Sequence, residues 1–173
     1  MTTIQFEENQ RFKELVIYIL LGLFQALFLW GLIQQVIFNK PWGTKPASDL
    51  ALIIINLGMF LLIILFFSFN LKTIITQQYI GFRFFPLQIR MRIIYWEQVK
   101  NVSIIQYDGM KEYWGFGLKY MPGKGWCYTM PGHFGIKLTL TNEKKILIGT
   151  HKTNEISHIL SNLKERRIII LPG

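Results

Sequence analysis

The sequence predicts an α+β protein in which a hydrophobic helical hairpin is followed by an antiparallel β-sheet and one closing helix. Two long apolar runs without a formal charge occupy residues 15–38 and 50–71. Short segments rich in β-branched and aromatic residues then follow one another up to residue 150. An amphipathic stripe comes last, from Thr153 onward. We therefore divide the chain into a hairpin region, residues 1–71, and a second domain, residues 72–173.

Each apolar run is long enough to cross a bilayer as a helix. The runs hold 24 and 22 residues, and at 1.5 Å per residue each reaches about 33 to 36 Å, against a hydrocarbon core of about 30 Å. A cleaved signal peptide fits the first run poorly, because the apolar region of a signal peptide is only about 7 to 15 residues long. We interpret residues 4–14 as a polar lead-in that extends the first helix.

The charge distribution predicts the orientation of the hairpin. The chain carries a net charge of +9, and residues 72–173 hold 15 basic and 6 acidic side chains. An excess of Lys and Arg marks the cytoplasmic side, and two spans return the chain to its starting side. We expect a multi-pass protein of the inner (cytoplasmic) membrane with both termini cytoplasmic. The single Cys127 is compatible with that reducing side.

Small and amide side chains mark the faces of the two spans that contact other helices, because small residues let helix backbones approach and amides need hydrogen-bond partners. They form three patches: Gly22, Gln25 and Ala26 on one face of the first span, Gly31 and Gln34 on nearly the opposite face, and Asn56 and Gly58 on the second span. The second and third patches match in depth, so we predict that they close the hairpin. The first patch is then left for a second copy or another membrane protein, unless Gln25 bonds within its own helix or to water.

The second domain has the periodicity of short strands. The expected strands cover residues 72–78, 79–85, 88–95, 99–107, 113–120, 126–130, 135–141 and 144–150. Within residues 88–95 the alternation predicts Ile89, Met91 and Ile93 on one face and Arg90 and Arg92 on the other. The closing helix carries Ile156, Ile159, Leu160 and Leu163 at helical spacing, so this stripe is expected to cover an apolar surface.

Four segments of this domain, in their order and spacing, resemble the bacterial pleckstrin-homology-like (PH-like) domains of small two-span membrane proteins. They are IYWEQV at 94–99, WGFGL at 114–118, GIKL at 135–138 and KILIGT at 145–150. The resemblance covers about residues 72–165, and the preceding hairpin is similar too. It implies a seven-stranded antiparallel bent sheet or barrel capped by one C-terminal helix, in a family without a settled biochemical role.

Residues 108–133 are rich in glycine and aromatic residues, and large aromatics with a polar edge suit interfaces. We therefore predict a groove or edge that binds a segment of a partner protein. The alternative is that the aromatics fill the core of two twisted hairpins. The candidate residues are Tyr113, Trp114, Phe116, Tyr120, Trp126 and Tyr128.

A second candidate surface is basic. Arg83, Arg90 and Arg92 are predicted to face anionic lipid headgroups, each contributing about 1 kcal/mol if it lies close to the membrane surface. The alternative is a solvated polar face. Many PH domains bind phosphoinositides through a Lys and Arg cluster between their first two strands, but residues 77–79 here are Gln, Gln and Tyr. That activity is therefore not carried over.

The sequence shows neither a catalytic constellation nor a metal-ligand spacing among its His, Cys and acidic residues, and it shows no nucleic-acid reader motif. We expect no cofactor, no metal, no nucleic acid and no small-molecule substrate. The expected function is a non-enzymatic membrane-anchored binding or scaffold module whose partners are the lipid bilayer and another protein or a second copy. The alternatives are a small accessory subunit of a membrane complex that acts through its hairpin, and weak binding of anionic lipids by the basic face.

Overall fold

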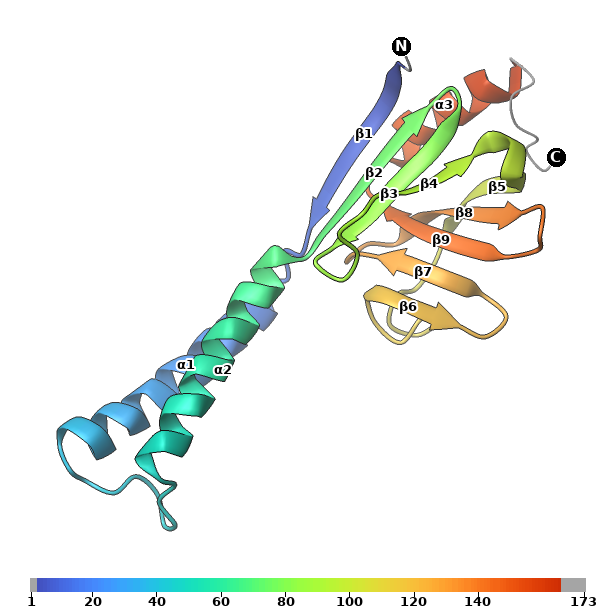
Figure 1. Cartoon of the computed structure of the whole chain (residues 1–173). Coiled ribbons are helices and arrows are strands. Elements are labelled where there is room, and N and C mark those ends of the chain that lie inside the picture. Colours follow the sequence, from blue (N-terminus) through green and yellow to red (C-terminus); the bar gives the residue numbers. More distant parts are fainter. Residues whose placement is uncertain (1–2, 166–173) are drawn as a thin grey trace. The chain divides into compact units, whose positions relative to one another are not determined.

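The computed structural model describes residues 3–165 (Figure 1). The chain divides into two compact units. The helical unit is Lys13–Ser68, and the sheet unit combines Met1–Phe12 with Phe69–Gly173. The predicted α+β class is confirmed at this level, because apolar helices, β-sheets and a closing helix are all present.

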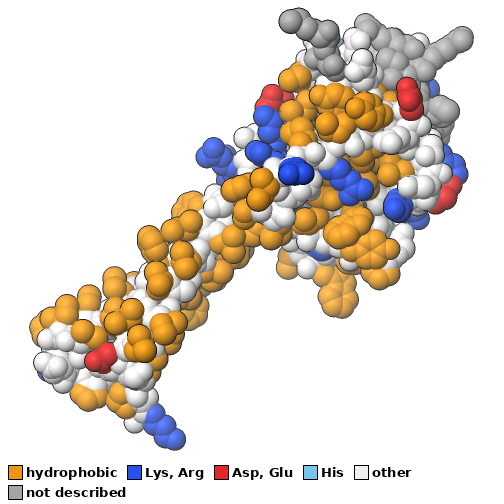
Figure 2. All heavy atoms as spheres, in the orientation of Figure 1, with side chains coloured by type: hydrophobic (Ala, Val, Ile, Leu, Met, Phe, Trp, Pro, Cys, Tyr) orange, Lys and Arg blue, Asp and Glu red, His pale blue; other side chains and the backbone are white. Residues whose placement is uncertain are grey.

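The helical unit consists of α1 (Leu15–Leu32), which continues as a π-helix, η1 (Ile33–Ile37), and of α2 (Asp49–Ser68). Leu15–Ile37 and Asp49–Ser68 have mean hydropathies of 2.3 and 3.0, so both are long and apolar enough to cross a membrane. Figure 2 shows hydrophobic side chains along both helices. At the start of α2 the Ser48 hydroxyl accepts a hydrogen bond from the Ala51 amide, which caps the helix.

The sheet unit contains two sheets, and neither closes into a barrel. One has the order β1-β2-β3-β4, all antiparallel, with bounds Ile4–Arg11, Asn70–Thr76, Tyr79–Phe85 and Arg92–Tyr95. The other has the order β5-β8-β9-β7-β6, with bounds Val99–Gln106, Phe134–Leu140, Lys145–Thr150, Gly125–Thr129 and Gly117–Met121. A short 3-10 helix, η2 (Trp96–Gln98), joins the two sheets, and β7 pairs with β9 in parallel.

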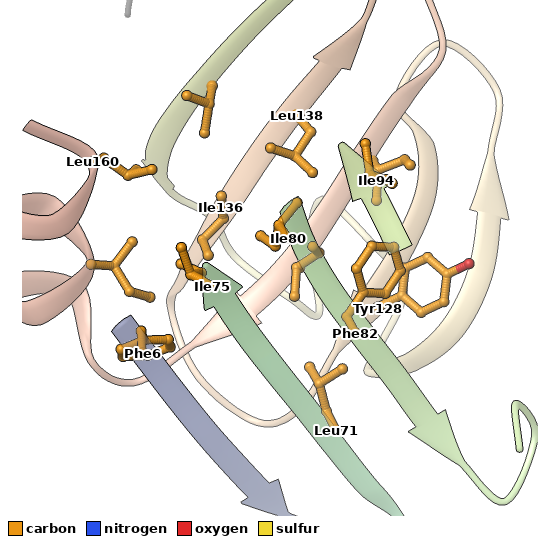
Figure 3. Close-up of a cluster of buried hydrophobic side chains, with 14 of the residues drawn as sticks. Phe6, Leu71, Ile75, Ile80, Phe82, Ile94, Tyr128, Ile136, Leu138 and Leu160 are labelled. Carbon is orange, nitrogen blue, oxygen red and sulfur yellow. The ribbon is translucent and has the colours of Figure 1, made fainter. Parts of the chain in front are cut away.

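The hydrophobic core lies between these sheets and under the last helix, α3 (Thr153–Glu165) (Figure 3). Phe82 of β3 and Tyr128 of β7 pack edge to face with ring centroids 4.7 Å apart. Ile156, Leu160 and Leu163 of α3 are buried and Ile159 packs against them. The amphipathic stripe is therefore confirmed, and each such side chain contributes roughly 1.5 to 3 kcal/mol through its burial.

The interpretation of residues 4–14 as a helical lead-in is wrong. Residues 4–11 form β1, which pairs with β2 with one register shift between Ile4 and Phe6. Its inward face carries Phe6, Glu8 and Gln10, all buried. The two polar side chains find partners inside. The Glu8 carboxylate accepts hydrogen bonds from the Thr150 hydroxyl (2.6 Å) and from the His151 amide (2.9 Å), and Gln10 Nε2 donates to the Gly149 carbonyl (2.7 Å).

The helical unit is consequently an insertion between two neighbouring strands. Arg11, the last residue of β1, lies opposite Asn70, the first residue of β2. The Phe12 amide donates to the Phe69 carbonyl just beyond them. The sheet unit is therefore built from both sides of the hairpin, and it does not begin at the predicted residue 72.

The predicted strand at 88–95 is shorter and opposite in phase. β4 starts only at Arg92, and Ile94 is its buried apolar residue, whereas Ile89 and Ile93 are exposed. The six residues 86–91 form the loop between β3 and β4. The alternation at residues 89–93 therefore covers a loop and the outward face of β4. The core is formed by the next residue, Ile94.

Candidate functional site

Two of the six candidate aromatic residues belong to the core. Tyr113 is buried beside Tyr107, with ring centroids 5.3 Å apart, and Tyr128 is buried against Phe82. Both rings are held by packing on at least one neighbouring ring, and the Tyr128 hydroxyl accepts a hydrogen bond from Arg92 Nη1 (3.1 Å). For these two residues the alternative of core filling describes their position.

The loop before β6 is shaped by short-range contacts. The Asp108 carboxylate accepts hydrogen bonds from the Lys111 and Met110 amides, both at 3.0 Å, and these bonds lower the pKa of Asp108. The Asp108 amide in turn donates to Glu112, and this bond together with Lys124 lowers the pKa of Glu112. The hydrogen bonds of the Asp108 and Glu112 carboxylates therefore hold the backbone of this loop.

That loop presents the other aromatics unequally. Trp114 is 86 % exposed and adopts a left-handed backbone conformation, with φ +57°. Phe116 is half-buried over Gly109, where an added Cβ would lie 2.4 Å from the Phe116 ring. Gly109 is thus needed because the ring approaches its backbone closely.

Tyr120 and Trp126 form a pair on the β6–β7 hairpin. They are opposite each other in the antiparallel ladder, and their rings meet edge to face at 5.5 Å. Both are exposed. Cross-strand aromatic pairs of this kind are rigid and amphipathic, which makes them suitable anchors for a ligand.

This pair borders a pocket of about 430 Å³ in the sheet unit. Its wall is formed by the β6–β7 hairpin, by the turn between β8 and β9, and by Arg92 of β4. The lining residues are Arg92, Tyr120, Gly123, Gly125, Trp126, Asn142, Glu143, Lys144, Lys145 and Ile146. One glycine is required for this shape, since a Cβ at Gly125 (φ +85°) would lie 2.0 Å from the Lys145 carbonyl oxygen.

The pocket is electropositive. Arg92, Lys144 and Lys145 line it, and the one acidic residue in its wall, Glu143, forms an ion pair with Lys100. The Lys145 ammonium donates to the Gly123 carbonyl (3.2 Å), which holds it across the β6–β7 turn. A concave site with three cations and one internally paired carboxylate attracts anionic groups, while the two rings offer apolar contact.

The three candidate lipid-binding arginines are thereby separated. Arg92 belongs to the pocket and contacts Tyr128. Arg83 lies on the outer side of β3, opposite Lys72 of β2, and Arg90 is exposed in the β3–β4 loop. The aromatic and the basic residues were predicted to form two separate sites, whereas the structure brings Arg92, Tyr120 and Trp126 together in one.

Inside the helical unit the predicted pairing of patches is wrong. Gln25 Nε2 donates to Asn56 Oδ1 (3.1 Å), so Gln25 has a partner within the chain. Asn56 Nδ2 donates to the Phe28 carbonyl (3.1 Å) and to the Leu52 carbonyl (2.9 Å). Gly31 faces the Trp42 ring of the connecting loop, since an added Cβ would lie 2.4 Å from it.

The remaining candidates of the helical unit do not gather at one contact. Gly22, Ala26 and Gly58 are exposed, and Gln34 is half-buried in η1. A contact that was not predicted joins η1 to the start of α2 at the end of the connecting loop. Gln35 Nε2 donates to the Ala47 carbonyl and to the Asp49 carboxylate, both at 2.7 Å.

Among residues 3–165 no cluster of three or more His, Cys, Asp and Glu side chains is arranged to hold a metal ion. Cys127 is buried, and this burial raises the pKa of its thiol. Neither observation adds a second site to the pocket.

No protein-family model matches this chain, and no curated protein matches it.

Proposed function

We propose that this protein is a non-enzymatic, membrane-anchored binding module that holds an acidic segment of a partner protein in the pocket between β6–β7 and the β8–β9 turn. In this proposal α1 and α2 span the inner (cytoplasmic) membrane. The sheet unit is a PH-like domain on the cytoplasmic side, with both termini there. The observation that carries the proposal is the convergence of Arg92, Lys144 and Lys145 with the rings of Tyr120 and Trp126.

The membrane anchor is supported by the surface of the helices. Leu23, Leu57 and Phe67 are each more than half exposed, and many other apolar side chains of the two helices are exposed as well. Exposing such a continuous apolar surface to water costs about 25 cal/mol per Å², and lipid removes that cost. The excess of basic residues in the sheet unit supports the cytoplasmic side.

The PH-like assignment is supported by two packed sheets, one antiparallel and one mixed, followed by a helix whose apolar side chains join the core. The sheet unit departs from the expected seven-stranded pattern. The structure describes nine strands, of which β1 precedes the hairpin, and β7 joins β9 in parallel.

An acidic protein segment suits the pocket better than a neutral one. Three cations in a concave site steer carboxylates toward it. Tyr120 and Trp126 can then hold an apolar side chain of the same segment, in the way that aromatic residues anchor many interfaces. The hairpin raises the effective concentration of such a partner at the membrane, so individually weak contacts are sufficient.

Site-specific photo-crosslinking in native membranes tests this function. A photoreactive amino acid at Tyr120 should capture a protein, whereas the same group at the exposed Ser157 of α3 should not. Lys144→Glu should reduce the capture at least about tenfold, and Lys164→Glu, which changes the charge by the same amount on α3, should leave it unchanged.

A different pattern would support the accessory-subunit alternative. If a photoreactive group at the exposed Gly22 of α1 captured a protein while the group at Tyr120 captured none, the hairpin would be the interaction surface and the pocket proposal would be wrong.

A further inference from the structure

The β3–β4 loop carries an exposed apolar tip. Leu87 is 60 % exposed and Ile89 is 73 % exposed, and Phe85 and Ile93 on either side of them are exposed as well. Single exposed apolar residues are common and need no explanation, but four within nine residues do.

This loop has its own hydrogen bonds. The Gln88 amide donates to the Phe84 carbonyl (2.6 Å), and Gln88 Nε2 donates to the Arg90 carbonyl (2.9 Å). The backbone on both sides of Leu87 and Ile89 is thereby turned back on itself. The two side chains consequently project away from the core on a tip held by these bonds.

The loop starts at the end of the sheet where the chain leaves for the helices and returns from them. Arg11, Asn70 and Phe85 occupy one rung across β1, β2 and β3. Neighbouring strands lie about 5 Å apart, and the two residues from Asn70 to Ser68 span at most about 7 Å. Phe85 is therefore within about 12 Å of the last residue of α2 along the chain, whatever the arrangement of the units.

Basic residues stand at this same end. Arg11 is exposed at the last position of β1, Arg90 is exposed in the loop, and Arg83 is on the outer side of β3. Lys72 is nearby but pairs with Glu7 (2.6 Å), whereas none of the three arginines takes part in an ion pair with a described residue. An apolar tip with positive charge beside it is the combination that favours an anionic bilayer surface.

We infer that the β3–β4 loop inserts Leu87 and Ile89 into the headgroup boundary of the bilayer, with Arg83 and Arg90 against anionic lipid headgroups. This inference rests on the proposed function in one respect, the spanning of the membrane by α1 and α2. It is independent of the pocket and of any protein partner. The loop acts as a third contact with the membrane and fixes which end of the sheet unit faces the lipid.

The test uses the purified full chain reconstituted into vesicles of about 70 % phosphatidylcholine and 30 % phosphatidylglycerol. An environment-sensitive fluorophore is attached to Leu87→Cys or to Ile89→Cys in a Cys127→Ala background. The control is Ser157→Cys, at an exposed position of α3 outside the pocket. We expect a blue-shifted emission at 87 and 89 and at least about twofold stronger quenching by spin-labelled lipids than at 157.

Two comparisons sharpen the result. Arg90→Glu should reduce the quenching at 89 in the anionic vesicles and leave it unchanged in phosphatidylcholine alone. Equal quenching at 87, 89 and 157 overturns the inference when the chain resists extraction at alkaline pH, because the helices are then in the membrane without the loop. If the chain is extracted, the membrane anchor and the inference with it are wrong. Cys127 is buried, so its replacement by Ala removes packing in the core. A photoreactive amino acid at 87 avoids this replacement and provides a second readout in the wild-type background, the capture of lipid.

Discussion

The helical unit carries its apolar residues on its surface, whereas the sheet unit buries them in its interior. In the two candidate spans only 6 % and 11 % of the most apolar window is buried inside the structure. In the sheet unit Phe82, Ile136 and Leu138 are fully or almost fully hidden between the sheets and α3. The difference teaches that the helical unit leaves most of its apolar surface uncovered, whereas the sheet unit makes its own apolar interior.

The buried polar groups differ in the same direction. The sheet unit buries a carboxylate, Glu8, and gives it a hydroxyl and an amide as donors. The helical unit buries the neutral amide of Asn56, which bonds to the half-buried Gln25 and to backbone carbonyls. Hydrogen bonds to a charged group contribute more than those between neutral groups, so losses should be larger in the sheet unit.

The largest expected effect tests whether β1 belongs to the sheet unit. Phe6→Ala removes a ring that is 4 % exposed in the main core, and this should cost about 3 to 5 kcal/mol. Hydrogen exchange of β8 and β9 in the full chain measures the loss. The control is Ile4→Ala, at an exposed position of the same strand. Equal effects of the two substitutions would mean that β1 does not pack as described.

The next effect tests the buried carboxylate. Glu8→Gln keeps the shape but replaces one accepting oxygen by a donor that faces the Thr150 hydroxyl or the His151 amide. We expect a loss of about 1.5 to 3 kcal/mol by the same exchange measurement. Glu7→Gln on the outward face breaks only the partly exposed pair with Lys72 and should cost at most about 1 kcal/mol. A larger loss at Glu7 would reverse the assigned faces of β1.

In the helical unit the corresponding effect should be smaller. Asn56→Leu removes the bonds to Gln25 and to the Phe28 carbonyl, and such bonds contribute about 0.6 kcal/mol on average and about 1.7 at most in membranes. Unfolding of the hairpin in mixed detergent micelles measures it. Gln34→Leu serves as the control and should change the stability less, because Gln34 is not the partner of Asn56. The opposite ranking would restore the pairing predicted from depth.

The smallest effect concerns pH. The pKa values of Asp108 and Glu112 are lowered in the folded loop, chiefly because backbone amides donate to the charged carboxylates. Their contribution is therefore fully present above the ordinary carboxyl range and is lost as the pH falls through the lowered values. Amide chemical shifts of Met110 and Lys111 should titrate below the usual pKa of Asp, about 3.9. In Asp108→Asn this transition should disappear, and a transition at the ordinary value would contradict the contacts described.

The apolar helices and the strands after residue 70 were predictable because their patterns are long and repeat regularly. Residues 79–85 were placed correctly, and α3 starts at the predicted Thr153. β1 was missed because its inward face carries Glu8 and Gln10, so it lacks the apolar alternation of a buried strand. The hydrogen-bond partners of these two side chains lie about 140 residues away in the chain, and no local pattern reveals them.

The pairing within the hairpin was mispredicted because the helix was treated as regular to its end. α1 passes into the π-helix η1, which changes the angle per residue just where Gln34 lies. Gly31 was predicted to contact the second helix, but it lies against the Trp42 ring of the connecting loop. Likewise, the pocket could not be found from the sequence, since Arg92, Trp126 and Lys144 come from three separate segments that only the packed sheets bring together.

The insertion of the hairpin between β1 and β2 also constrains biosynthesis. The first strand is made before either helix, and it can pair with β2 only after the 58 intervening residues have been synthesised. Because β1 and β2 are hydrogen-bonded neighbours, the two ends of the hairpin must be on the same side of any bilayer that the helices cross. If only one of the two helices crossed a bilayer, Phe6 would be kept away from its place in the core. A complete sheet is thus incompatible with the crossing of a bilayer by one helix alone.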